Sequence, residues 1–426
     1  MPYYYIVKRK CQEKRGKDMS LLLAIIYVAF ISLGLPDAML GSAWPIMHTE
    51  IHAPVSYAGV ISMIICAGTI IASLKSDWLT KRFGTGKVTA FSVALTAVSL
   101  FGFSVSNSFL MLCVIALPYG LGAGAVDAAL NNYVALHFEA KHMSWLHCFW
   151  GGGASLGPYI MGACLTNGLT WHSGYRTVGI LQVVLTAILF MSLPMWKTGN
   201  GVKAEEKLGN SNHAQVTAEA EAAFVTPKSI STIELFQMKG AKPAMLAFFC
   251  YCGLEQTAGI WASSYLVIGK GLSEETAAGL AALFYLGITV GRFLSGFITM
   301  KLNDRSMVRL GQGVIMAGIV LLCLPLGNET FSNVITFIGL VLVGLGCAPI
   351  YPSLLHATPE HFGESYSQAI MGIQMACAYV GSMLMPPVFG LMAEYFSIYL
   401  YPILLLVILI LMIVGAEGLN RQVNRK

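Results

Sequence analysis

The chain has 426 residues, of which 56% are hydrophobic and only 11% are charged, and its mean hydropathy is +0.68. A soluble domain carries roughly 25% charged residues, so this chain has too few charges to cover a solvated surface. The composition excludes a disordered chain, a collagen, a coiled coil and an ordinary soluble enzyme. It predicts an all-α membrane protein that crosses the bilayer many times.

The basic residues are informative through their positions more than through the net charge of +5. They gather before the first apolar run, in alternate segments between later runs and at the C-terminus. Arg176 and Lys270 fall in the other segments, and Arg292 lies inside an apolar run. Loops rich in Lys and Arg stay on the cytoplasmic side. We therefore predict a multi-pass protein of the inner or plasma membrane with both termini cytoplasmic, and no nucleic acid partner.

The apolar runs can be divided into membrane spans by length, because a helix needs about 20 residues to cross the hydrocarbon core. The chain then contains twelve predicted spans, at residues 20–47, 55–75, 88–106, 109–138, 144–168, 172–196, 241–269, 274–300, 306–327, 331–357, 365–393 and 397–417. They form two pseudo-symmetric six-helix bundles, over residues 19–196 and 241–417. A cytoplasmic extension (1–18), a polar cytoplasmic linker (197–240) and a cytoplasmic tail (418–426) complete the predicted organisation.

Short basic segments follow the second helix of each half. One reads S-D-W-L-T-K-R-F-G-T-G-K from Ser76 to Lys87, and the other reads G-R-F-L-S-G-F-I-T-M-K-L-N-D-R from Gly291 to Arg305. Internal repeats of this kind are typical of alternating-access carriers, whose substrate site lies between the halves. We predict gating roles here for Lys81, Arg82, Gly84, Gly291 and Arg292. The long side chain of Arg292 is expected to reach the cytoplasmic interface rather than the substrate.

The six-plus-six layout and these paired loops resemble the major facilitator superfamily, over essentially the whole chain. Leu79 and Arg82 match the signature G-x-L-x-D-R-x-G-R-K of that family, whereas Lys81 replaces its Asp and Asp77 occupies its first Gly position. Three stretches resemble the fucose permease branch of sugar/proton symporters: L-G-L-P-D-A, G-A-G-A-V-D-A-A-L-N-N-Y-V and L-H-C-F-W-G-G-G-A-S-L-G-P. The resemblance implies carboxylates in the first and fourth spans for proton coupling and substrate binding.

Ionisable side chains inside spans are costly, at least ~2.5–3.5 kcal/mol at a helix centre, and this makes Asp37 and Asp127 candidates for proton coupling. Asp37 follows Pro36 about 27 Å into the first span at 1.5 Å per residue, in the outer half of the membrane. The alternative is a hydrated interfacial Asp. Asp127 has Asn131 one turn on and Asn132 beside it. Carboxylate and amide groups together suit sugar hydroxyls, whereas a helix–helix hydrogen bond is the alternative.

Further polar and aromatic residues extend this candidate site. His147 is a third candidate for proton coupling because imidazole titrates near neutral pH, although a lone His is more often structural. Glu255 is the fourth, and we expect only one of Glu255 and Gln256 to face a cavity, since adjacent helical side chains diverge by about 100°. The predicted substrate-binding residues are Asn131, Asn132, Trp150, Gln256, Trp261 and Gln374.

These residues together predict a carrier rather than an enzyme. The sequence contains no P-loop, no nucleophile–His–acid grouping and no metal-ligand spacing, so we expect no cofactor and no metal. The predicted function is proton-coupled symport of a sugar or similar small polar solute by a monomer in the bilayer. The alternative is a proton-coupled efflux antiporter, favoured by Gly157-Pro158 and by the 21 Met residues. A membrane enzyme or receptor is disfavoured.

Overall fold

The computed structural model describes residues 2–54, 57–208, 232–272, 274–324 and 329–423. Most of the predicted linker, at 209–231, lies outside the described residues, as do 325–327 of the ninth predicted span and the last three residues of the predicted tail. Each of the twelve predicted spans falls on a helix, or a run of helices, of the described residues.

Within the described residues, the first half of the chain contains seven helices. They are α1 (Pro2–Gly34), α2 (Met39–Glu50), α3 (Tyr57–Phe83), α4 (Thr85–Phe103), α5 (Phe109–His137), α6 (Ala140–Thr166) and α7 (Trp171–Leu208). The first predicted span is divided between α1 and α2 by a turn at residues 35–38. Pro36 lies in this turn and has no backbone N–H to donate, which favours a break in the helix.

The second half repeats this layout after a short helix, α9 (Thr232–Gln237). Its helices are α10 (Ala241–Ser264), which continues as a π-helical turn η1 (Tyr265–Gly269), α11 (Glu274–Ile298), α12 (Asp304–Cys323), α13 (Glu329–Cys347), α14 (Ile350–His356), α15 (Thr358–Phe362), α16 (Glu364–Tyr395), the 3₁₀ turn η2 (Ile398–Leu400) and α17 (Tyr401–Val423). The tenth predicted span corresponds to α13 and α14, with α15 directly after it.

Nine stretches within the described residues are long and apolar enough to cross a membrane. The helices α6 and α10 are not among them, although both are long. The first contains His147 and three consecutive glycines, and the second contains Glu255 and Gln256. These two helices therefore combine the length of a membrane span with polar residues that the sequence assigns to a site.

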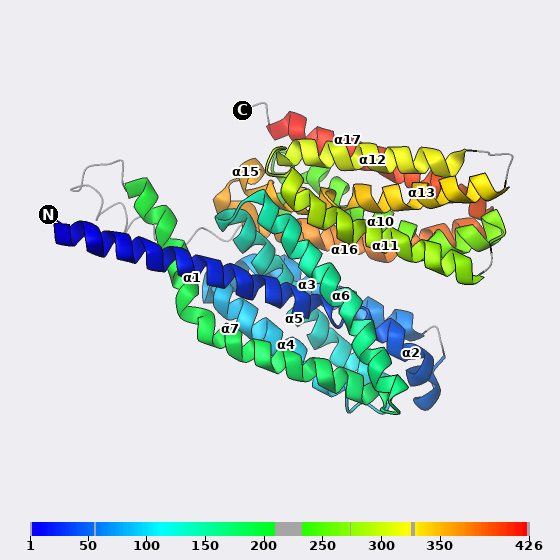
Figure 1. Ribbon diagram of the computed structural model, residues 1–426, viewed down its shortest axis with the longest axis horizontal. Helices are drawn as coiled ribbons and strands as arrows, with labels where there is room; N and C mark the ends of the chain where they lie inside the picture. The colour runs from blue at the N-terminus through cyan, green and yellow to red at the C-terminus, as the bar shows by residue number, and fades with distance from the viewer. Residues whose placement is uncertain (1, 55–56, 209–231, 273, 325–328, 424–426) are drawn as a thin grey trace.

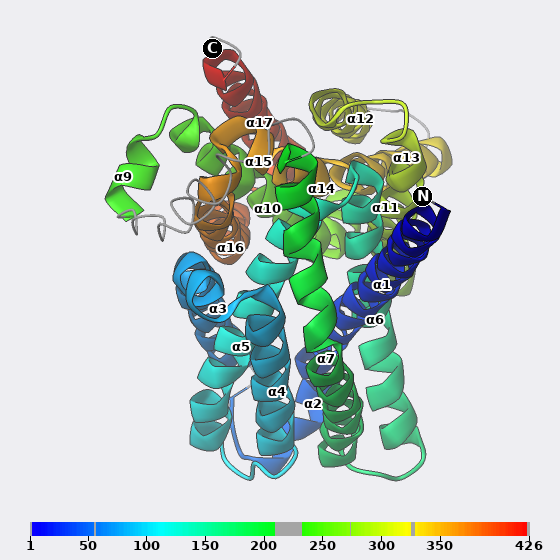
Figure 2. The ribbon, with the colours of Figure 1, turned by 90° about the vertical axis from the view of Figure 1, so that its left-hand side faces the viewer.

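The helices form two bundles that lie side by side (Figures 1 and 2). One contains α1 to α7 and the other contains α10 to α17, and their ribbons lie closest toward the end where both chain termini are found. We call this the closed end. Hydrogen bonds join the bundles there: Gln368 of α16 donates to Ser76 Oγ at 3.1 Å and to the Ala128 carbonyl at 3.0 Å. Ser367 donates to Asn132 of α5.

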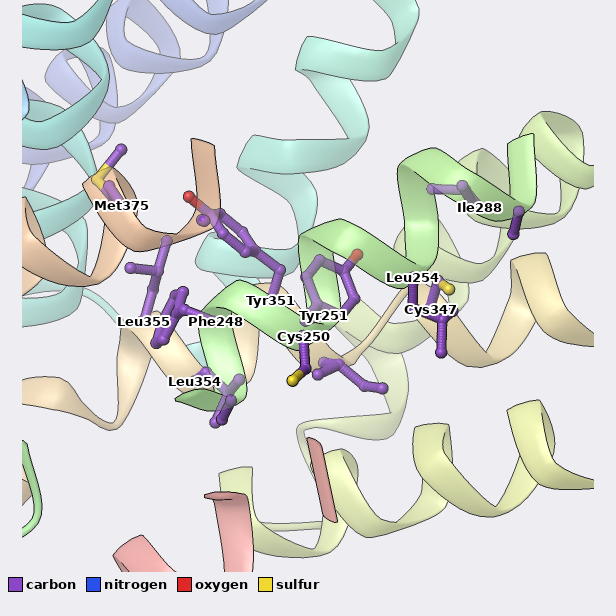
Figure 3. Packing of buried hydrophobic residues seen from close by; sticks show 14 of the residues in the cluster. Phe248, Cys250, Tyr251, Leu254, Ile288, Cys347, Tyr351, Leu354, Leu355 and Met375 are labelled. Carbon is purple, nitrogen blue, oxygen red and sulfur yellow. The ribbon is translucent and has the colours of Figure 1, made fainter. Parts of the chain in front are cut away.

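A hydrophobic cluster runs through both bundles and supports the surfaces where they face each other. Figure 3 shows part of it, in which the rings of Phe248 and Tyr251 of α10 lie near Tyr351 of α14. The ring centroids of Phe248 and Tyr251 are 5.5 and 5.7 Å from that of Tyr351. Close packing of large rings fixes the orientation of their polar ends, and Tyr251 and Tyr351 line the central cavity described next.

Candidate functional site

A cavity of about 430 Å³ lies between the two bundles. Both halves of the chain line it, through residues of α1, α2, α3, α5 and α6 on one side and of α10, α11, α14 and α16 on the other. Its volume is in the range of small-molecule sites. Six ionisable or amide side chains that the sequence singled out line it: Asp37, Asp127, His147, Glu255, Gln256 and Arg292.

Asp37 is presented to the cavity by the turn between α1 and α2. The Asp37 amide donates to the Gly34 carbonyl at 3.1 Å, which closes the turn. Two donors reach its carboxylate: Trp150 Nε1 at 2.9 Å from Oδ2 and Tyr119 OH at 3.3 Å from Oδ1. The side chain remains exposed within the cavity. Asp37 is therefore a carboxylate that is held in place and still open to water.

Asp127 lies deeper, with an exposed fraction of 8%. Asn131 Nδ2 donates to its Oδ1 at 2.8 Å, one turn along α5. Tyr379 of α16 donates to its Oδ2 at 2.9 Å. Because α5 and α16 belong to different bundles, Asp127 accepts a hydrogen bond that joins the two halves of the molecule across the cavity.

His147 extends this network onto α6. Its Nε2 lies 3.1 Å from Asn131 Oδ1, so the ring donates when that nitrogen carries the hydrogen. The imidazole is buried between Phe30 and Tyr351, each in an edge-to-face arrangement. One continuous polar chain thus runs from Tyr379 through Asp127 and Asn131 to His147.

Glu255 and Arg292 form an ion pair in the wall of the cavity. Arg292 Nη2 lies 3.4 Å from Glu255 Oε1, and the side chains are 6% and 13% exposed, respectively. The guanidinium also lies over the Trp150 ring, 5.5 Å from its centroid, a favourable cation–π geometry. The expectation that Arg292 extends to the cytoplasmic interface is wrong, because Glu255 and Trp150 hold it beside the cavity. Both Glu255 and Gln256 line the cavity, contrary to the expectation of only one.

Four predicted substrate-binding residues do not line this cavity, because their polar groups bond within the protein. Asn131 connects Asp127 to His147, and Asn132 accepts from Ser367. Trp261 Nε1 donates to the Pro386 carbonyl at 2.9 Å. Gln374 Oε1 accepts from Thr358 Oγ1 at 2.9 Å. Of the six, Trp150 and Gln256 are the two that line the cavity.

The residues predicted to gate lie away from the cavity, apart from Arg292. Lys81 Nζ pairs with Asp77 Oδ2 at 2.8 Å within α3, and the Arg82 guanidinium lies over the Phe83 ring. Gly84 has a φ of +80° between α3 and α4, a conformation that a side chain would strain. Gly291 packs against Ala348 and Leu345.

Tyrosines are the site residues that the sequence reasoning missed. Tyr119 and Tyr379 donate to the two aspartates, and Tyr251 and Tyr351 line the cavity. The chain contains 18 Tyr residues, and a Tyr in a span is ordinary packing unless its hydroxyl has a polar partner. Tyr119 shares a predicted span with Asp127, and Tyr251 shares one with Glu255, which was the available signal for these two. Tyr351 and Tyr379 share no predicted span with a candidate carboxylate.

The sequence profile described as Major Facilitator Superfamily matches residues 26–332 and, in a second match, residues 244–419. Two curated relatives are similar over most of their length. "Bypass of stop codon protein 6" of Saccharomyces cerevisiae is 24% identical over 88% of this chain and 78% of its own. The glucose/mannose transporter GlcP of Bacillus subtilis is 23% identical over 77% of each.

Solved structures of low sequence identity have the same fold. The transporter FucP in its outward conformation aligns with a TM-score of 0.67 and 15% identity, over 93% of this chain and 97% of its own. The proton:xylose symporter XylE aligns with a TM-score of 0.74 and 13% identity, over 96% of each chain. These similarities, together with the helices described above, confirm the predicted twelve-helix architecture.

Proposed function

The chain belongs to the Major Facilitator Superfamily, and from this membership we propose that it is a proton-coupled symporter for a sugar or similar small polar solute. The observation that supports the proposal most is the position of two aspartates at one cavity between the bundles. Asp37 is open to water there, and Asp127 accepts a hydrogen bond from the opposite bundle. Curated relatives include a glucose/mannose transporter, and the similar folds include a proton:xylose symporter.

The proposed cycle begins with the solute and a proton entering from the open side of the cavity. Gln256, the tyrosine hydroxyls and the aspartates supply donors and acceptors for hydroxyl groups, and Trp150 supplies a flat apolar face. A proton on Asp37 removes its charge, so less solvation is lost when the cavity closes. Both aspartates are proposed to bind protons in turn.

Asp127 links protonation to the change of conformation in this proposal. A charged acceptor makes a hydrogen bond roughly twice as strong as a neutral one. Protonation of Asp127 therefore weakens its bond to Tyr379, which joins α5 to α16. The bundles then separate more easily at the closed end and release solute and proton on that side. Following the distribution of basic residues, we propose that the closed end is cytoplasmic.

The test is uptake of labelled glucose, mannose, fucose and xylose into proteoliposomes under an imposed pH gradient. The unmodified protein is expected to accumulate one of these solutes when the exterior is acidic. Asp37→Asn and Asp127→Asn should each lose accumulation driven by the gradient. Glu394→Gln, which removes an exposed carboxyl group of α16 away from the cavity, is the matched control and should transport normally.

Other results would replace this proposal. If both Asn variants retain uptake that still depends on the pH gradient, the aspartates do not couple transport to protons. Uptake that needs sodium but ignores the proton gradient contradicts proton coupling. Export of the solute against an inward proton gradient indicates efflux antiport instead.

A further inference from the structure

A second cavity, of about 860 Å³, lies on the lateral surface of the molecule rather than between the polar walls of the central site. Its lining comes from α3, α4, α5, α9 and α16, and we call it the lateral groove. In Figure 2, α3, α9 and α16 lie on the same side of the molecule. Most of its lining is apolar, and these large side chains are exposed: Ile71, Leu74, Trp78, Phe83, Phe91 and Leu95. Such an exposed apolar hollow in a membrane protein faces lipid.

Positively charged side chains lie along the α3 side of the lateral groove. Lys75 lines it and is exposed, and within the described residues no carboxylate lies within ion-pair distance of it. Asp77 also lines the groove, but Lys81 neutralises it through the 2.8 Å ion pair. Arg82 lies about 10 Å further along α3, seven residues on at 1.5 Å per residue. Its guanidinium is 5.8 Å from the ring centroid of Phe83, which lines the groove. In the part of the chain that the structure describes, Lys75 and Arg82 are therefore two positive charges without a carboxylate partner.

The groove has a polar acceptor beside these charges. Asp77 Oδ1 is buried and has no hydrogen-bond partner within the described residues. This atom has almost no accessible surface, so a lipid headgroup cannot reach it, and the negative charge of Asp77 stays within its pair with Lys81. The phosphate of a phosphatidylglycerol headgroup therefore has the exposed Lys75 or Arg82 as its partner.

The length of the groove suits an acyl chain. Lys81 and Ile71 are ten residues apart on α3, which is about 15 Å at 1.5 Å per residue. One leaflet of the hydrocarbon core is also about 15 Å thick. Trp78 and the basic residues stand at the end of α3, as aromatic and basic residues do at a membrane interface. A lipid with its headgroup at this end would extend its chains along Ile71, Phe91 and Leu95.

We propose that the lateral groove binds one anionic phospholipid, and that this lipid favours the conformation in which the closed end is shut. The preference for the shut conformation follows from the helices that form the groove. The groove is formed by α3, α4 and α5 of one bundle and by Ala369 and Ile373 of α16 in the other. Separation of the bundles would divide the site, so a ligand that binds the undivided groove stabilises the undivided arrangement.

Native mass spectrometry of the full-length protein tests lipid binding without any transport assay. The protein in detergent is given equal amounts of phosphatidylglycerol and phosphatidylcholine. The mass spectrum is expected to show one phosphatidylglycerol molecule still bound to the protein. Lys75→Gln and Arg82→Gln remove exposed charges and should each lower its retention by about fivefold. The matched control is Lys301→Gln, an exposed lysine in the corresponding loop of the other half, which should retain the lipid. Ala369→Trp should exclude the lipid by filling the groove.

Thermal unfolding gives a second, independent measurement. Phosphatidylglycerol should raise the melting temperature of the unmodified protein and of Lys301→Gln, and much less that of a Lys75→Gln/Arg82→Gln variant. The melting temperature without lipid shows that each variant is folded. Equal retention of the two lipids by the unmodified protein, or equal loss in Lys301→Gln and Lys75→Gln, would overturn the proposal. Retention of a lipid by Ala369→Trp would place the lipid elsewhere.

Discussion

The ion pair between Glu255 and Arg292 is an expensive arrangement for two side chains in a membrane protein. Removal of charges from water costs several kcal/mol per ion. The attraction between the two charges offsets this desolvation cost only in part. The 3.4 Å contact is long, and Arg292 Nε has no hydrogen-bond partner within the described residues. Trp150 contributes further stabilisation through the face of its ring. Each charge is therefore tolerable mainly because the other is present.

A double-mutant cycle tests this dependence. Glu255→Gln and Arg292→Gln should each lower stability by about 3–5 kcal/mol, since each leaves a charge unpaired in the cavity wall. The double variant should recover part of the loss, because neither charge remains. Thermal unfolding in detergent measures the effect. Additive losses in the double variant would show that the two side chains do not stabilise each other.

For single residues, the sequence located the charged side chains at the cavity better than it located the amide side chains. Asp37, Asp127 and Glu255 were identifiable because charge inside a span is costly whatever surrounds it. The roles of Asn131 and Gln374 depend on partners, His147 and Thr358, that only the packed helices bring near. Arg292 was misplaced for the same reason. A snorkelling Arg and a paired Arg have the same sequence context.

Helices α1 and α6 approach each other through glycines. A Cβ atom on Gly153 would lie 1.9 Å from the Ile31 carbonyl oxygen, and one on Gly157 would lie 1.9 Å from that of Leu35. Gly34 faces the Trp150 carbonyl in the same way. Small residues let transmembrane helices pack backbone to backbone. The close approach of α1 therefore accounts for Gly157 of the Gly157-Pro158 pair.

Gly153→Ala should force α1 and α6 apart, because the new methyl group meets backbone that cannot move aside. We expect a destabilisation of about 1–3 kcal/mol, typical of overpacking, and weaker transport, since Asp37 and Trp150 lie on either side of the contact. Gly152→Ala is the control, because nothing lies within 4 Å of its Cβ position. It should be neutral or slightly stabilising. Similar melting temperatures for the two variants would contradict the contact.

The helices themselves could be predicted from length and hydropathy, and so could most of their ends. The exceptions are α1, which begins at Pro2 rather than at residue 20, and α7, which continues to Leu208 rather than ending at residue 196. The division of the first span into α1 and α2 was harder to foresee. Pro36 indicates a weakened helix there, but whether the chain bends or breaks depends on what the turn contacts. Here the turn places Asp37 against Trp150 and Tyr119, and this stabilises the break.

The two bundles are held at the closed end mainly by small and neutral side chains. Gly372 of α16 faces Ser73 of α3, where an added Cβ would lie 2.2 Å from the Ser73 carbonyl oxygen. Gln368 and Ser367 hydrogen-bond across the same interface. The Asp77–Lys81 pair lies within α3 and does not cross to the other bundle. Direct packing and these neutral hydrogen bonds therefore hold this end shut, together with the bond that Asp127 accepts from Tyr379 and the one between His356 Nε2 and the Phe138 carbonyl.

Gly372→Ala should shift the population toward a conformation with this end open, because the methyl group fits only when α3 and α16 separate. Spin labels at Lys87→Cys and Lys301→Cys, in a background without the native cysteines, report the separation by electron–electron double resonance. The distance distribution should gain a longer component. Gly313→Ala, whose Cβ position has nothing within 4 Å, should leave it unchanged. An identical distribution in both variants would show that α3 and α16 accommodate the methyl group.

The architecture of two six-helix halves was predictable because hydropathy and the repeated loops specify it. The conformation was not. Whether the halves meet at one end or the other depends on contacts between residues hundreds of positions apart, such as Gln368 and Ser76. These contacts must form and break during transport, so no single arrangement of them is specified by local sequence pattern.

The glycine contact between α1 and α6 has a mechanical consequence. The backbones touch at Gly34, Gly153 and Gly157, so the helices cannot slide or tilt against each other without steric overlap. We therefore expect α1 and α6 to move as a rigid pair. Asp37 and Trp150 lie on either side of this contact, and we expect their 2.9 Å hydrogen bond to persist when the bundles move. In the proposed cycle, the carboxylate and the indole ring beside it would then change their exposure together.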